Sequence, residues 1–149
     1  MHVRGVRGAV TAEANTEQAI LDATRTLLAE MARANDVEPH EIAAIVFTAT
    51  PDLTAAFPAE AARQLGWLSV PLMSGVEIDV PGALPRCIRV LMLWNTPRAP
   101  EEVVHVYLGD ATRLRPDLAA SARGADGDPS RDQARGSHRG QEIFRVPPG

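Results

Sequence analysis

The segment CIRVLMLWNT, residues 87–96, constrains the fold more than any other part of the chain. Side chains alternate between the two faces of a strand, so its ten residues predict a β-strand with one wholly apolar face. That face consists of Ile88, Val90, Met92 and Trp94, and the other combines Cys87, Leu91 and Leu93 with Arg89. An unpaired charge is costly to bury. Arg89 therefore reaches solvent or pairs with a carboxylate, which the residues alone favour, or it binds a ligand.

Other segments predict strands and helices in alternation. Alternation in HVRGVRGAVT (2–11) predicts a strand with Arg4 and Arg7 on opposite faces. Apolar residues at helical spacing over residues 16–36 predict an amphipathic helix of about five turns, with Asn15 as its N-cap and Gln18 as the reciprocal partner. Further strands are predicted over 42–50, 70–74 and 105–108, and short helices over 57–66 and 100–104.

The cationic side chains exclude several reaction classes. All 15 Lys and Arg residues are arginine, and the chain contains no lysine. Schiff-base enzymes, pyridoxal-phosphate enzymes and P-loop nucleotidases need a lysine amine, so none of these chemistries is expected in its usual form. Arginine stays protonated and presents a planar fork that suits carboxylate or phosphate. The arginines therefore indicate a small anion-binding site.

Charge and cysteine content restrict the partners and the compartment. Residues 1–118 carry 10 Arg against 15 Asp and Glu, a net charge of −5, which argues against a nucleic-acid partner. The longest aliphatic run, residues 42–47, is far shorter than the ~20 residues of a membrane span. With no apparent secretory signal and a single cysteine, Cys87, we expect a cytoplasmic protein without a membrane partner or an internal disulfide.

The acidic and histidine side chains are candidates for acid–base chemistry or metal binding. In GVEIDV, Glu77 and Asp79 alternate with apolar residues, so both carboxylates share a face if this segment is a strand. A solvated face, or pairing with Arg89 and Arg7, is favoured over acid–base work by the two acids. The histidines are scattered and predict no metal site; they are His2, His40, His105 and His138.

The composition divides the chain into two parts. Residues 1–118 form the predicted domain, and residues 119–149 are rich in Gly, Arg, Asp and Ser with little apolar content. Such a composition is typical of a disordered tail.

Several motifs follow one another in the first part of the chain; they are RGVRGA, TATPDL, AAFPAEA, EIDVPGALPRCIRV, HVYL and LRPDL. In this order and at near-matching spacing, they resemble the monofunctional AroH-class, Bacillus-type chorismate mutases. The resemblance implies an α+β fold in which two main helices pack on a mixed β-sheet. It also implies a homotrimer, a pseudo-α/β-barrel with its active sites between subunits. The implied reaction is the Claisen rearrangement of chorismate to prephenate in phenylalanine and tyrosine biosynthesis, without cofactor or metal.

The resemblance also assigns site residues. Arg89 matches the arginine that donates to the ether oxygen, and Glu77 the glutamate that binds the substrate hydroxyl and holds that arginine. Arg7 and Tyr107 match groups that bind a substrate carboxylate. Further substrate-binding positions are Phe57, Ala59, Arg63, Met73, Ser74 and Arg115. Met73 and Ser74 stand where the family often has threonine and cysteine, and Glu60 where relatives have lysine.

Two other functions are compatible with such a chain. The first is a non-catalytic trimer that binds a small dicarboxylate and regulates, which Glu60 and Met73 favour. The second is an imine deaminase of the Rid type, which also uses clefts between subunits, although its signature motifs are not evident.

Overall fold

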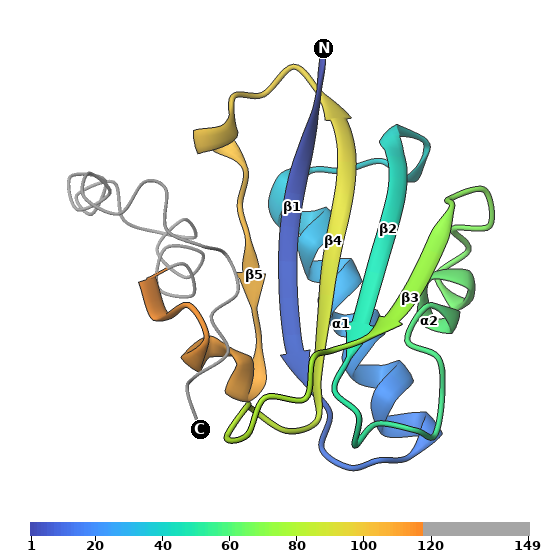
Figure 1. Cartoon of the computed structure of the whole chain (residues 1–149). Coiled ribbons are helices and arrows are strands. Elements are labelled where there is room, and N and C mark those ends of the chain that lie inside the picture. Colours follow the sequence, from blue (N-terminus) through green and yellow to red (C-terminus); the bar gives the residue numbers. More distant parts are fainter. Residues whose placement is uncertain (118–149) are drawn as a thin grey trace.

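The computed structural model describes residues 1–117, within which a five-stranded mixed sheet carries both α-helices on one face (Figure 1). The sheet order is β3-β2-β4-β1-β5. The strands are β1 (His2–Thr11), β2 (Ile42–Ala49), β3 (Leu72–Val76), β4 (Cys87–Thr96) and β5 (Val106–Tyr107). The helices are α1 (Glu17–Asn35) and α2 (Glu60–Gln64), and short 3-10 helices span Pro39–Glu41, Pro100–Glu102 and Gly109–Arg113. The predicted α+β class is confirmed. The predicted tail lies outside the described residues.

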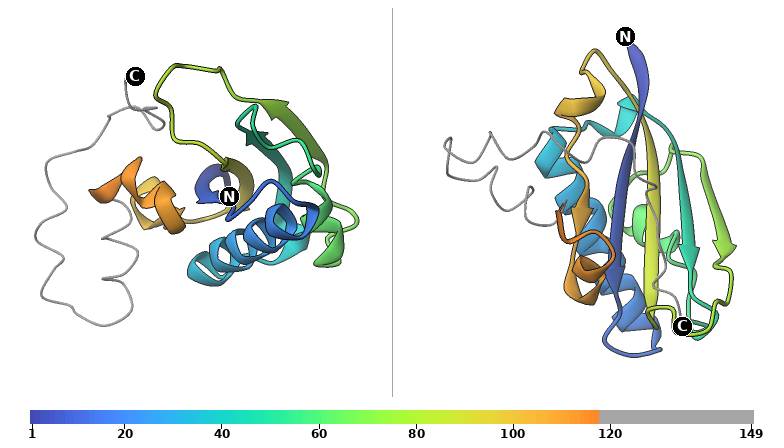
Figure 2. Two further views of the ribbon diagram at one scale, coloured as in Figure 1. Left: turned by 90° about the horizontal axis from the view of Figure 1, so that it is seen from below. Right: turned by 60° about the vertical axis from the view of Figure 1, so that its left-hand side comes forward.

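The sheet is mixed because its central strands pair antiparallel and its edge strands pair parallel. Strand β4 runs antiparallel to both of its neighbours, β1 and β2. The edge strands β3 and β5 run parallel to β2 and β1 respectively. Figure 2 shows α1 lying along one face of the sheet, and no α-helix of residues 1–117 covers the opposite face. No helix within residues 1–117 has the length and apolar content needed to cross a membrane.

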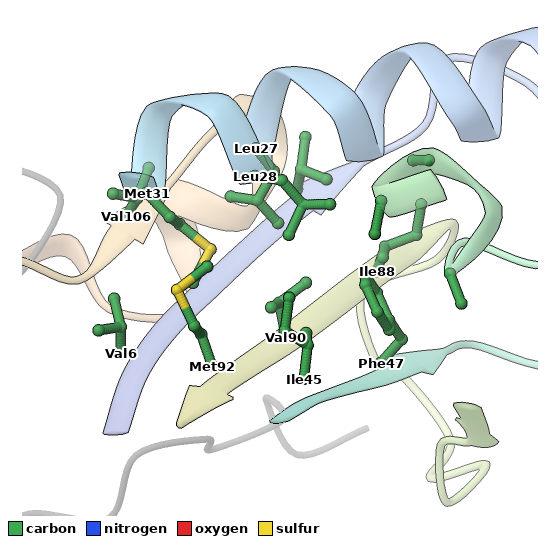
Figure 3. Close-up of a cluster of buried hydrophobic side chains, with 14 of the residues drawn as sticks. Val6, Leu27, Leu28, Met31, Ile45, Phe47, Ile88, Val90, Met92 and Val106 are labelled. Atoms are coloured by element: carbon green, nitrogen blue, oxygen red, sulfur yellow. The ribbon is translucent and has the colours of Figure 1, made fainter. Parts of the chain in front are cut away.

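The core lies between the helices and one face of the sheet. Helix α1 contributes Ile20, Leu27, Leu28 and Met31, all fully buried. They pack above a sheet surface formed by Val6, Ile45, Phe47, Ile88, Val90 and Met92 (Figure 3). The apolar face predicted for residues 87–96 is therefore the core face. Arg89 lies on the opposite, open face because consecutive residues of a strand alternate.

The start of α1 corrects one prediction. Its N-cap is Thr16, whose hydroxyl accepts a hydrogen bond from the backbone N of Ala19 at 3.1 Å. Asn15 instead accepts from the backbone N of Thr54 at 2.9 Å and of Ala55 at 3.1 Å. Both Asn and Thr are good N-caps. The loop after β2 decides between them, because it uses the Asn15 carboxamide.

Some predicted boundaries are also wrong. Strand β3 starts two residues later than expected, and α2 is shorter than residues 57–66 because Phe57–Ala59 form turns before it. The helix expected over 100–104 is a three-residue 3-10 helix. The segment GVEIDV is not one strand: β3 ends at Val76, and the backbone N of Val80 donates to the carbonyl of Ile78 in a tight turn. The predicted alternation of Glu77 and Asp79 therefore does not apply.

Gly8 gives a prediction about stability. A Cβ atom there would overlap Sδ of Met31 and lie 3.1 Å from Cδ1 of Leu27, two fully buried side chains. Overfilling a packed core typically costs about 1–3 kcal/mol, so Gly8→Ala is expected to lower the free energy of unfolding by that amount in urea titrations. The matched control is Gly75→Ala, because a Cβ at Gly75 meets no heavy atom within 4 Å. Equal stabilities of the two variants would contradict this account.

Candidate active site

One row of residues crosses all five strands and organises the site. The register pairs Gly75 with Thr48, Thr48 with Arg89, Arg89 with Ala9, and Ala9 with Tyr107. Residues paired across neighbouring strands point to the same face. The row therefore places Arg89 and Tyr107 on the open face, with the small Ala9 between them.

Arg89 forms a two-pronged ion pair with Glu77. Its Nε donates to Oε1 of Glu77 at 2.6 Å, and its Nη2 donates to Oε2 at 2.5 Å. The Arg89 side chain is 16% exposed and that of Glu77 is 9% exposed, so the pair is well shielded from water. Burial alone would raise the pKa of Glu77, but hydrogen bonds from Arg89 and Thr48, together with the Arg89 charge, lower it. The carboxylate is therefore ionised at neutral pH.

Arg7 and Tyr107 place further donors on the same face. Nη1 of Arg7 and the hydroxyl of Tyr107 are buried, and neither has a hydrogen-bond partner among the described residues. Burial lowers the pKa of Arg7, and the charge of Arg115 lowers it further. Burial raises the pKa of Tyr107, which keeps its hydroxyl protonated and able to donate. Buried polar groups nearly always have partners, so this pair of donors indicates a place for an anionic ligand.

Arg115 lies close enough to Arg7 and Tyr107 for its charge to lower the pKa of both groups. It forms an ion pair with Asp117 at 3.1 Å. It follows the 3-10 helix Gly109–Arg113, an element that the sequence analysis did not predict. The structure thus gathers Arg89, Glu77, Arg7, Tyr107 and Arg115, five of the predicted site residues, on one side of the sheet.

A hollow beside the ion pair is mainly apolar. Apart from Glu77 and Arg89, its lining consists of Thr50, Ile78, Ala83, Leu84, Cys87 and Leu114. Burial raises the pKa of the Cys87 thiol to about 12, so this group is not a thiolate nucleophile. Residues 1–117 contain no group of three or more His, Cys, Asp or Glu side chains placed to hold a metal ion.

Of the predicted site residues, Glu77 and Arg89 line this hollow, and Arg7, Tyr107 and Arg115 lie on the same side of the sheet outside its lining. The remaining predicted residues do not line it either; they are Phe57, Ala59, Arg63, Met73 and Ser74. Phe57 is 76% exposed and Met73 is 67% exposed. Ser74 shares a strand face with Leu72, which packs against the core, so Ser74 points away from the Glu77 side of the sheet. Arg63, on α2, pairs with Glu60 at 2.7 Å on the surface. Met73 lies with Ser74 on the edge strand β3, and Ala59, just before α2, is buried in the main core.

Two polar contacts were missed by the sequence analysis. The hydroxyl of Thr48 donates to Oε1 of Glu77. Nδ1 of His105 accepts a hydrogen bond from the backbone N of Arg7 at 3.0 Å. Alternation in IAAIVFTAT, with Thr48 opposite in direction to Phe47, could have placed Thr48 on the open face. Nothing local indicates the role of His105, because its partner is 98 residues away.

His105 predicts a pH dependence of stability. Burial, then the charges of Arg7 and Arg115, lower its pKa to about 4. The unfolded chain therefore binds more protons than the folded chain between about pH 6.5 and pH 4. Stability is expected to be highest above pH 6.5 and to fall towards pH 4, by up to about 3 kcal/mol. His105→Asn keeps an acceptor that does not titrate, so urea titrations at several pH values should show a flatter profile. An unchanged profile would contradict this assignment.

Comparisons with known proteins show the family of this chain. Residues 3–118 match the family model described as chorismate mutase type I. The chain belongs to the type I chorismate mutase family. It is 58% identical over 120 residues to the chorismate mutase AroH of Thermus thermophilus, covering 80% of this chain and 98% of the relative. Identity to AroH of Bacillus subtilis is 44% over 120 residues, covering 80% and 94%.

A solved chorismate mutase from Clostridium thermocellum has the same fold. Its TM-score to this chain is 0.73 at 50% sequence identity, covering 74% of this chain and 98% of that one. The chorismate mutase family predicted from the motifs is thus confirmed, and with it the enzyme class, an isomerase. Neither the regulator nor the deaminase reading gains support from these matches.

Proposed function

We propose that this chorismate mutase converts chorismate to prephenate by Claisen rearrangement at the open-face site, as a step of phenylalanine and tyrosine biosynthesis. Membership of the family and the two AroH relatives support the reaction. The observation that carries the location is the pair of buried donors on Arg7 and Tyr107 on the open face that also holds the Arg89–Glu77 ion pair. Such a cluster fits a substrate that carries two carboxylates.

The rearrangement breaks a C–O bond and forms a C–C bond within one molecule. Negative charge develops on the ether oxygen as the bond breaks, and the guanidinium of Arg89 donates to that oxygen. Glu77 holds the guanidinium in place and accepts from the substrate hydroxyl. Because the ion pair is preformed and shielded, it stabilises the developing charge without reorganisation. No group of the chain forms a covalent bond to the substrate, and no cofactor or metal takes part.

Arg7 and Tyr107 donate to a substrate carboxylate, and Arg115 adds positive charge beside them. These contacts favour the folded conformer in which the reacting carbons meet. Orientation of this kind can lower a barrier by several kcal/mol.

The site is completed by a second subunit in a homotrimer, built as a pseudo-α/β-barrel. Phe57, Ala59, Arg63, Met73 and Ser74 lie on the β3 and α2 edge of one chain, away from its own hollow. They meet an Arg89 cluster only if that edge contacts a neighbouring subunit. Large exposed apolar side chains on and just after β3, at Met73, Val76 and Ile78, support such an interface.

The test is loss of chorismate and appearance of prephenate with purified protein, without added metal or nucleotide. The full chain and a shortened chain ending at Leu118 are compared, and sedimentation gives the subunit number. Turnover by both chains as trimers would support the proposal. Tight binding of a bicyclic transition-state mimic without turnover would contradict it and favour the regulator. Imine hydrolysis without chorismate loss would favour the deaminase.

A further inference from the structure

Thr48, on the neighbouring strand β2, contacts the Arg89–Glu77 ion pair. It lies on β2, between Gly75 of β3 and Arg89 of β4 in the row that crosses the sheet. Its hydroxyl donates to Oε1 of Glu77, the same oxygen that accepts from Nε of Arg89. One carboxylate oxygen therefore receives two donors from two different strands.

Glu77 needs such support because it lies beyond the end of β3, where the ladder stops. The strand ends at Val76, and the next three residues lead into a tight turn. One backbone bond continues the pairing with β2, from the N of Glu77 to the carbonyl of Ala49 at 2.9 Å. A glutamate side chain has several rotatable bonds, and holding it in one conformation costs conformational entropy. Thr48 is short, β-branched and set in an inner strand, so it is the stiffer partner.

We propose that Thr48 is a positioning residue for the rearrangement: its hydroxyl fixes the Glu77 carboxylate, and through it the Arg89 guanidinium, in the arrangement that meets the substrate. This rests on the proposed function of the site. The Arg89 side chain has several rotatable bonds, so it constrains the position of the carboxylate less than a short side chain on an inner strand does. The Thr48 hydroxyl therefore fixes the Glu77 carboxylate and the Arg89 guanidinium relative to the sheet.

The charged and titratable groups around Glu77 set the expected response to pH. Arg89 of β4 is paired with it, and Cys87 of the same strand has a thiol pKa of about 12 and stays neutral. Farther along the open face lie Arg7, Tyr107 and Arg115. The hydrogen bond from Thr48 is one of the causes that lower the pKa of Glu77. Removing this donor is therefore expected to raise that pKa and to move the acid limb of the pH–rate profile to higher pH.

The experiment compares Thr48→Val with Thr48→Ser in the full chain. Valine keeps the branched shape and removes the hydroxyl, whereas serine keeps the hydroxyl and removes the methyl group. Hydrogen bonds to charged groups have effects that correspond to roughly a tenfold or larger change in rate, so Thr48→Val is expected to lower kcat/KM by about that factor. Thr48→Ser is expected to restore most of it, along with the position of the acid limb.

A second measurement does not depend on turnover. Carboxyl 13C resonances are titrated in the wild type and both variants, with the Glu77 signal assigned by its loss in Glu77→Gln. The proposal requires a higher Glu77 pKa in Thr48→Val and a return towards the wild-type value in Thr48→Ser. An unchanged Glu77 pKa in Thr48→Val, or equal impairment of both variants, would overturn it. If the wild type failed to consume chorismate, the proposed function would fall, while the carboxyl titration would still decide whether Thr48 holds Glu77.

Discussion

Replacing Arg89 by glutamine is expected to reduce kcat for chorismate by about 10²–10³-fold while the chain stays folded. Arg89 supplies a fixed positive donor in a shielded place, where its side chain is only 16% exposed. Loss of a preorganised donor to a developing negative charge typically has an effect of this size. Glutamine removes the charge and keeps a polar head, on a side chain that is about two atoms shorter. Chorismate consumption gives the rate, and circular dichroism with thermal unfolding checks the fold.

Two further variants sharpen this prediction. Arg89→Lys keeps the charge but loses the planar fork that makes two bonds to Glu77, so its activity is expected to stay far below wild type. Arg33→Gln is the matched control, because Arg33 pairs with Glu30 on the exposed surface of α1. Its activity should equal that of the wild type. Near-normal turnover by Arg89→Gln would refute the electrostatic role given to Arg89.

Glu77→Gln has the second largest expected effect, a loss of roughly ten- to a hundredfold in kcat/KM. The carboxylate makes charged hydrogen bonds to Arg89, and such bonds contribute about 1.5–3 kcal/mol each. Glutamine has nearly the same shape, but it leaves the guanidinium without a counter-charge in a shielded place. A lower free energy of unfolding is therefore expected as well. Steady-state kinetics and urea titrations measure the two effects.

The pH dependence separates this role of Glu77 from a purely steric one. Its pKa is lowered in the folded chain, so the carboxylate contributes stability and activity at and above its ordinary pKa near 4.5. Both contributions are lost as the pH falls through the lowered value. The variant cannot titrate there and should lack this acid limb. Glu30→Gln, which alters the exposed pair with Arg33 on α1, is expected to keep it. Identical pH profiles for wild type and Glu77→Gln would exclude a catalytic carboxylate at position 77.

Periodicity predicted the long elements well and their ends less well. The two faces of β4 and the amphipathic α1 follow from side-chain alternation and helical spacing, which are local properties. The N-cap of α1 could not be chosen in this way. Asn15 and Thr16 are both suitable, and the loop at Thr54 and Ala55, about 40 residues away, takes the Asn15 side chain. The end of β3 at Val76 was likewise hidden, because GVEIDV continues to alternate after the chain has turned.

The sequence predicted which residues form the candidate site better than it predicted the contacts between them. Alternation left Arg89 with three readings, and the motifs then named Glu77 as its companion. The structure adds that Arg89 is paired with Glu77 and shielded from solvent, which confirms the carboxylate pair; ligand binding by Arg89 stays a prediction. Alternation could have placed Thr48 on the open face, but no local pattern indicates the partner of Thr48 or of His105, because these partners are 29 and 98 residues away. Contacts of this kind depend on strand register, which the sequence specifies only through the whole sheet.

The amino-acid sequence by itself determined the apolar faces, the long helix, the absence of lysine chemistry and the family to which the motifs belong. These depend on residue type and spacing along a few turns or strands. The tertiary structure alone decided how Arg89 and Glu77 pair and how well they are shielded, which donors on Arg7 and Tyr107 are buried without partners among residues 1–117, and which predicted residues do not line the hollow. The reason is that pairing β2, β3, β4, β1 and β5 side by side brings residues into contact that are far apart in the chain, and no local pattern records that order.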